Sequence, residues 1–212
     1  MIAVLTGDII DSSHHDKALW LPHLRAVLET QGKEGEDFEI YRGDEFQLRL
    51  SDPTKALEAA ICIKARLIAR ANTGIRIAIG LGEAVEPLEQ GAPLTLNSGP
   101  AFIRSGRKLD ELKAKKIHLG ILSMDEQFDL EWNLIIQWIL LTADNWSSVL
   151  AEIVELALLD PTRSQMDMAS LLEVKQSAVS QRLKRASFDL LSQTLSLFDQ
   201  KIGALCKISN SR

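Results

Sequence analysis

The chain has few residues that could stabilise it through cross-links or metal cages. Its 212 residues include two cysteines, Cys62 and Cys206, which lie far apart without disulfide or ligand spacing. Its four histidines are also scattered, so no zinc cage is expected. We therefore exclude a disulfide-rich secreted fold, and we interpret Cys62, which lies in an apolar helical pattern, as a small core residue.

Long apolar runs and aromatic residues are scarce as well. Residues 134–141 form the longest apolar stretch, which is too short to cross a bilayer, and residues 2–5 are too short for the core of a signal peptide. We expect a cytoplasmic protein without membrane contact. Trp132, Trp138 and Trp146 lie among aliphatic residues, which favours packing in the core or between domains over base stacking.

The overall charge provides no general affinity for nucleic acids. The formal net charge is −5 and the pI is about 5.4, with 46% hydrophobic and 25% charged residues. This composition is ordinary for a soluble globular protein, and an acidic chain repels polyanions. Any contact with DNA therefore requires a local basic face.

The first part of the chain alternates between strand and helix patterns, in the order β-α-β-β-α-β-α-β. The expected strands are residues 2–5, 38–41, 46–50, 75–81 and 116–122, and the expected helices are 16–31, 53–73 and 98–114. The first six elements match the βαββαβ motif of ferredoxin-like folds, in which the first strand lies beside the hairpin. We therefore predict that these six elements form an antiparallel sheet with their helices on a single face.

The predicted hairpin carries acidic residues where its strands turn. Gly43 supplies the positive φ that a tight turn needs, and Asp44 and Glu45 follow it. Asp8 comes directly after the first buried strand, so the expected strand order brings it close to Asp44. Paired carboxylates are typical Mg²⁺ ligands, and two such ions would support phosphoryl transfer. The alternative is structural, because aspartate is common in turns and before helices.

Several of these segments resemble nucleotidyl cyclases. Residues 41–46, Tyr-Arg-Gly-Asp-Glu-Phe, resemble the signature hairpin of GGDEF-type diguanylate cyclases, and residues 5–10 resemble the strand that carries the first metal aspartate. Residues 75–82 are similar to the glycine-ending strand that follows the hairpin. Residues 99–109 resemble the helix that bears the transition-state arginine. The resemblance implies a palm fold that binds Mg²⁺ through Asp8 and Asp44.

The same resemblance implies a nucleotide site beside the metal. Backbone amides after Asp8 would meet phosphate oxygens. The implied nucleotide-binding residues are Ile9, Ile10, Gly43, Glu45 and Arg107.

Two positions differ from the cyclase pattern. Arg42 replaces the first glycine of the hairpin, and Ile103 stands where the cyclase spacing has a catalytic asparagine. Because loss of one comparable donor lowers a rate by about 10²–10³-fold, these differences favour ligand sensing over turnover. The whole arrangement, including its helical C-terminal part, resembles the SatD family.

The rest of the chain is helical. Ser123 with Glu126 has the capping-box spacing that begins a helix, so we place the boundary there and predict an α/β palm over residues 1–125 and an all-α domain over 126–212. This C-terminal domain contains a helix-turn-helix pattern. Ser164 with Asp167 predicts a second capping box. The apolar stripe of the short helix that follows is expected to be Met166, Ala169 and Leu172.

The second helix of this pattern begins at Gln176 and has a polar, basic outer face. Such a helix enters the major groove, where glutamine bonds adenine, arginine or lysine bonds guanine, and serine bonds either. The candidate DNA-binding residues are Gln176, Ser177, Ser180, Gln181, Arg182, Lys184 and Arg185. The alternative is a solvated face on a dimerisation domain.

The last helical stretch carries a further apolar stripe. We expect it either to supply a homodimer contact or to pack onto the core of its own domain. The stripe consists of Leu191, Leu195, Phe198 and Ile202.

Together these patterns favour a dimeric DNA-binding transcription regulator with a degenerate cyclase-like sensor domain that binds a metal-nucleotide ligand. The alternative is a metal-dependent nucleotidyl cyclase or related phosphoryl-transfer enzyme with a helical dimerisation domain. A third interpretation is an adaptor that binds neither ligand.

Overall fold

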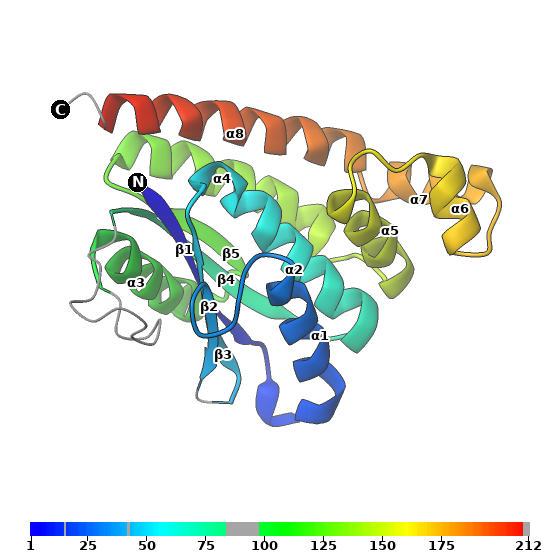
Figure 1. Cartoon of the computed structure of the whole chain (residues 1–212), viewed down its shortest axis with the longest axis horizontal. Helices are drawn as coiled ribbons and strands as arrows, with labels where there is room; N and C mark the ends of the chain where they lie inside the picture. Colours follow the sequence, from blue (N-terminus) through cyan, green and yellow to red (C-terminus); the bar gives the residue numbers. More distant parts are fainter. Residues whose placement is uncertain (15, 42, 84–97, 210–212) are drawn as a thin grey trace.

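A five-stranded mixed sheet forms the centre of the part of the chain that the computed structural model describes, residues 1–14, 16–41, 43–83 and 98–209 (Figure 1). The strands are β1 (Ile2–Ile9), β2 (Phe38–Tyr41), β3 (Glu45–Leu50), β4 (Ile75–Gly82) and β5 (Leu119–Leu122). Their order in the sheet is β2-β3-β1-β4-β5. β1 is antiparallel to both β3 and β4, whereas β4 and β5 are parallel.

Helices connect the strands and make up the whole C-terminal part. They are α1 (Lys17–Glu29), α2 (Ala56–Ala71), α3 (Pro100–Lys115), α4 (Glu126–Ala143), α5 (Ser148–Leu159), α6 (Gln165–Leu171), α7 (Gln176–Arg185) and α8 (Phe188–Ser209), with short 3₁₀ turns at η1 (Ser12–His14) and η2 (Pro53–Lys55). The predicted α+β class and the predicted element order are confirmed. Within the described ranges, no helix is both long and apolar enough to cross a membrane.

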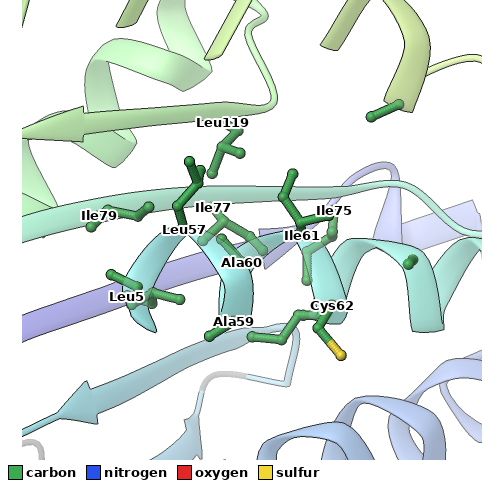
Figure 2. Packing of buried hydrophobic residues seen from close by; sticks show 14 of the residues in the cluster. Leu5, Leu57, Ala59, Ala60, Ile61, Cys62, Ile75, Ile77, Ile79 and Leu119 are labelled. Atoms are coloured by element: carbon green, nitrogen blue, oxygen red, sulfur yellow. The ribbon is translucent and has the colours of Figure 1, made fainter. Parts of the chain in front are cut away.

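β1 is buried on both faces because its side chains alternate between two layers of helices. Leu5 points to the layer that contains α2, where Leu57 and Ile61 pack over Ile77 of β4 (Figure 2). Val4 points to the opposite face, where it packs against Ala101 and Phe102 of α3. The two helices of the βαββαβ motif, α1 and α2, therefore share one face as predicted, whereas the later helix α3 covers the other face.

Gly80 of β4 allows α3 to approach this second face closely. A Cβ atom at this position would lie 2.2 Å from the carbonyl oxygen of Ala101 and 2.4 Å from the amide nitrogen of Ser105, both of α3. Ser105 is itself fully buried, and its hydroxyl accepts a hydrogen bond from Thr6 of β1 at 2.8 Å. The glycine therefore sets the distance between α3 and the sheet.

The predicted hairpin is present as β2 and β3. Tyr41 and Glu45 are its last register pair, and Gly43 in the turn has a φ of 92°, which an L side chain rarely adopts. The positive φ expected at Gly43 is confirmed.

The C-terminal helices share the core of the sheet. One continuous cluster of buried side chains runs from Leu5 of β1 through α2 to Trp132 of α4, Val154 of α5 and Phe198 of α8. The expected division at residues 125 and 126 therefore marks the start of α4 and not a boundary between two cores. The buried residues of α6 and α7 instead belong to a separate small cluster, which they share with α5.

The local prediction for the start of α4 is also wrong. Asp125 and not Ser123 is the N-cap, and its side chain accepts a hydrogen bond from the amide of Phe128. Ser123 instead donates its amide to Asp129 at 2.8 Å. Several oxygen acceptors compete for these amides, and the sequence pattern does not rank them.

Two buried ionic contacts bind α2 to the C-terminal helices. Lys64, which is 3% exposed, lies 2.6 Å from Asp144 at the end of α4. Glu155 of α5, which is 2% exposed, pairs with Arg66. Asp144 and Glu155 both belong to the C-terminal helical part, so these ion pairs connect α2 of the first predicted domain to the second.

Candidate functional sites

Three acidic residues lie together where β1 ends and β3 begins. Asp8 of β1 pairs in register with Glu45 of β3, and the amide of Ile9 donates to the carbonyl oxygen of Asp44 at 3.1 Å. Antiparallel pairing of the two strands brings these residues together, as the expected strand order requires. The predicted proximity of Asp8 and Asp44 is therefore present.

Two cations neutralise the carboxylate of Asp8. Arg76, its register partner on β4, donates from one guanidinium nitrogen to both carboxylate oxygens, at 3.0 and 2.8 Å. The ammonium group of Lys113 on α3 lies 3.9 Å away. Burial raises the pKa of the Asp8 carboxyl group, the charges of Arg76 and Lys113 lower it, and nearby Asp44 raises it. The net shift is upward, as expected for a half-buried acid beside a second one.

The other two acids also have partners. Glu45 accepts a hydrogen bond from the ammonium group of Lys113 at 3.1 Å. Asp44 accepts one from the hydroxyl of Ser12 at 2.5 Å. The cluster therefore holds three carboxylates, two cations and a hydroxyl, and it is largely satisfied by the protein.

This set of donors does not fit Mg²⁺. The ion binds free carboxylate oxygens in near-ideal octahedral geometry, and both oxygens of Asp8 are hydrogen-bonded to Arg76. In the described part of the chain, no three histidine, cysteine, aspartate or glutamate side chains are grouped so that they could hold a metal ion. We therefore assign no metal-dependent step to Asp8 and Asp44.

The amides expected to meet phosphate are used by the fold. Ile9 donates to Asp44, and Ile10 donates to the carbonyl oxygen of Gly74 at 3.0 Å. Each is a structural backbone bond at the edge of the sheet, so neither amide is available to a phosphate. This pairing weighs against the phosphate-binding roles predicted for Ile9 and Ile10, which stay predictions.

Arg107 and Gly43 are the remaining described residues that the cyclase resemblance implies for a nucleotide site. Arg107 is exposed on α3, two residues from buried Ser105 and hence on the opposite side of the helix. Gly43 lies near the ammonium group of Lys17, which would be 3.9 Å from a Cβ atom at this position. Arg42 lies outside the described residues.

Sequence patterns missed the two cations of the acidic cluster. Arg76 did give a signal, because it is the only charged residue in the apolar stretch 75–82 and such a charge needs a partner. Lys113 gave none, because lysine is common in the last turn of a helix, where Lys115 also lies.

A second candidate site is the unit formed by α6, residues 172–175 and α7. The predicted capping box is confirmed, since Ser164 and Asp167 each accept a backbone hydrogen bond from the other. Glu173 in the turn has a φ of 53°, and the amide of Val174 donates to Ala169 at 3.0 Å. These contacts fix the turn between the two helices.

A small core holds the two helices against α5. The buried residues are Ile153 and Ala157 of α5, Met168 and Ala169 of α6, and Val179 and Leu183 of α7. The expected stripe of α6 is partly wrong, because Met166 is exposed and Met168 is buried in its place. Only the inner face of α7 is used for packing, and its outer face remains solvent-accessible.

The outer face of α7 carries the residues predicted to bind DNA. Lys184 and Arg185 are exposed, and Arg182 is partly exposed. In the described part of the chain none of these three forms an ion pair, and no acidic residue occurs in the segment 174–188. Gln176 donates to Gln165 of α6 at 2.7 Å, which orients its amide group. The other exposed members are Ser177, Ser180 and Gln181.

The position of α7 makes this face accessible. Figure 1 shows α6 and α7 at one extremity of the molecule, beyond the end of the sheet.

No family model matches the chain, and no curated protein matches it.

Proposed function

We propose that the protein is a DNA-binding transcription regulator and that α7 enters the major groove. The observation that carries the proposal is the outer face of α7, which is basic, unpaired and free of acidic residues in a chain of net charge −5. A face that is only solvated would not need to carry positive charges alone in a chain whose net charge is negative. The α6–α7 geometry supports a helix-turn-helix.

Positions on α7 suggest a division of roles. Gln176 and Ser177 lie in the first turn, where residues of a recognition helix contact base edges. Lys184 and Arg185 lie in the last turn, where a long basic side chain reaches the phosphate backbone. We infer that sequence preference resides in the first half of α7 and electrostatic affinity in the second.

Within the same proposal, the sheet unit is a degenerate cyclase-like palm. The strand order β2-β3-β1-β4, with α1 and α2 on one face, supports a ferredoxin-like arrangement. The ion pairs of Asp8 and Glu45 favour a role without metal catalysis. They also weigh against the alternative of a nucleotidyl cyclase, which requires carboxylates free to bind Mg²⁺.

Removing two charges from the end of α7 should weaken DNA binding and reduce its dependence on salt. In the double variant Lys184→Ala/Arg185→Ala, we expect the slope of log K against log salt to fall by about 2, because each phosphate contact contributes about 0.9. Fluorescence anisotropy with a labelled duplex of about 25 base pairs, between about 50 and 200 mM salt, measures this slope.

The matched control is Arg107→Ala/Lys115→Ala, which removes the same charge from the exposed surface of α3. We expect it to leave the slope unchanged. Equal slopes for the α7 variant and the wild type, or no duplex binding by the wild type at low salt, would contradict the proposal.

Mg²⁺ should not strengthen nucleotide binding to the sheet unit. A ligand at a hundred times its dissociation constant adds about 2.7 kcal/mol, which raises the Tm by several degrees. We expect each nucleoside triphosphate to give the same Tm with Mg²⁺ as without it in a thermal-shift measurement. A rise that requires Mg²⁺ and disappears in Asp44→Asn would overturn this prediction and favour the enzyme.

A further inference from the structure

We infer that the outer face of α4 and α8 is the contact between two copies of this chain. This inference rests on the proposed function, because regulators of this type bind symmetric DNA sites as dimers. It names the surface that the dimer uses, which we call the α4–α8 face. The face is defined by Leu130, Leu134, Trp138 and Leu141 of α4 and by Leu190 and Leu197 of α8.

α4 is apolar on both sides. Trp132, Ile136 and Leu140 pack into the core, while Leu134 and Trp138 point the other way and are 59% and 67% exposed. After Glu131 the helix contains no charged residue up to its end at Ala143. An exposed apolar stripe of this size on a helix that already buries its inner side is typical of an interaction surface.

The stripe predicted for the dimer contact does not provide it. Leu191, Leu195, Phe198 and Ile202 of α8 are buried against the core of their own chain. Leu190 and Leu197 are exposed instead, on a neighbouring flank of the same helix. The outward surface of α8 therefore continues that of α4, beside which it runs along one edge of the molecule (Figure 1).

A groove of about 470 Å³ opens between the two helices. Its walls include Ile135, Ile139 and Leu191, and none of its lining residues is ionisable. The groove therefore offers no charged side chain to a nucleic acid or a charged peptide, whereas an uncharged apolar surface can pack into it. Since each chain has a net charge of −5, an uncharged patch is also where two copies repel each other least.

The α4–α8 face carries both an apolar groove and an exposed apolar side chain, that of Trp138. Trp138 lines the groove and is 67% exposed, so both features lie on the same face of each copy. Such self-complementarity is the requirement of an isologous dimer contact. A partner with a different surface would not need both features on one chain.

Burial of these side chains would stabilise a dimer. They are one tryptophan and five leucines, which are 42–69% exposed, and the free energy gained on association grows with the apolar area removed from water. The groove also begins at Ala186, directly after α7, so the dimer would hold the two α7 helices in a fixed relation.

Sedimentation velocity of the full chain without DNA tests the inference. At micromolar concentration we expect a particle of twice 23.5 kDa for the wild type. The variants Trp138→Glu and Leu141→Glu should sediment as monomers, with the dimer dissociation constant raised at least about 100-fold. Both positions are exposed, so circular dichroism should show the wild-type fold. Leu19→Glu, an equally exposed leucine on α1, should remain dimeric.

A monomeric wild type, or variants that dimerise as tightly as the wild type, would overturn the inference. This result is independent of DNA. A dimer that fails to bind duplex DNA contradicts the proposed function alone, whereas a monomer whose DNA affinity still depends on Lys184 and Arg185 contradicts the dimer alone.

Discussion

Replacing Asp144 by alanine should lower the free energy of unfolding by about 3–5 kcal/mol, because the variant leaves the Lys64 ammonium group buried without a counter-charge. Lys64 is 3% exposed and lies 2.6 Å from one carboxylate oxygen of Asp144. The other oxygen lies 3.0 Å from Nδ1 of His118. Urea denaturation followed by circular dichroism measures the change.

The control for Asp144 is Asp110→Ala, which removes an exposed acid from α3 and should change stability by less than about 0.5 kcal/mol. The double variant Lys64→Met/Asp144→Ala should recover much of the loss, since it removes the buried charge together with its partner. A cost below about 1 kcal/mol for Asp144→Ala alone would show that water or another acid replaces the pair.

The same pair makes stability sensitive to acid. Burial raises the pKa of Asp144, but the hydrogen bond from His118 and the charge of Lys64 outweigh it and lower the pKa below its usual 3.8. A lowered pKa in the folded state means that the stabilisation is complete above the unfolded pKa and is lost as the pH falls through the folded value. The Asp144→Ala variant should lack this part of the acid sensitivity.

Replacing Arg66 by alanine should cost about 3–5 kcal/mol as well, since Glu155 is 2% exposed and loses its main partner. The nearest remaining cation, Arg70, lies 4.0 Å from Glu155 and is already paired with Glu152 at 3.0 Å. Arg70→Ala is the matched control, and we expect a smaller loss because Arg70 is more exposed. Urea denaturation at several pH values measures both.

The pH dependence of the stability of the Arg66→Ala variant tests whether the unpaired carboxyl group of Glu155 causes the loss. Burial raises the pKa of its carboxyl group, and Arg66 opposes the shift. A raised pKa in the folded state means that stability is greatest below the unfolded pKa and declines as the pH rises through the folded value. Without Arg66 this pKa rises further, so the deficit of the variant should grow as the pH rises above the ordinary carboxyl value of 4.5. A deficit that is constant with pH would assign the loss to packing alone.

The sequence predicted more of the α7 face than of the acidic cluster. On α7, the sequence predicted both the helix and its exposed face, because each depends on the spacing of Val179 and Leu183 within one helix. In the acidic cluster, it predicted that Asp8 and Asp44 lie close together but not that Arg76 and Lys113 pair with Asp8 and Glu45. Those cations come from β4 and α3, 68 and more residues away along the chain.

The sequence by itself determined the strands, the hairpin at Gly43 and most helices, because these follow from periodicity and capping within a few neighbouring residues. Only the tertiary structure decided that α3 lies on the opposite face of the sheet from α2. The tertiary structure likewise decided that α4 and α8 share one core with the sheet and α2. It also decided which charges are paired. Long-range packing and ion pairs depend on which distant side chains meet, and that information is not contained in local spacing.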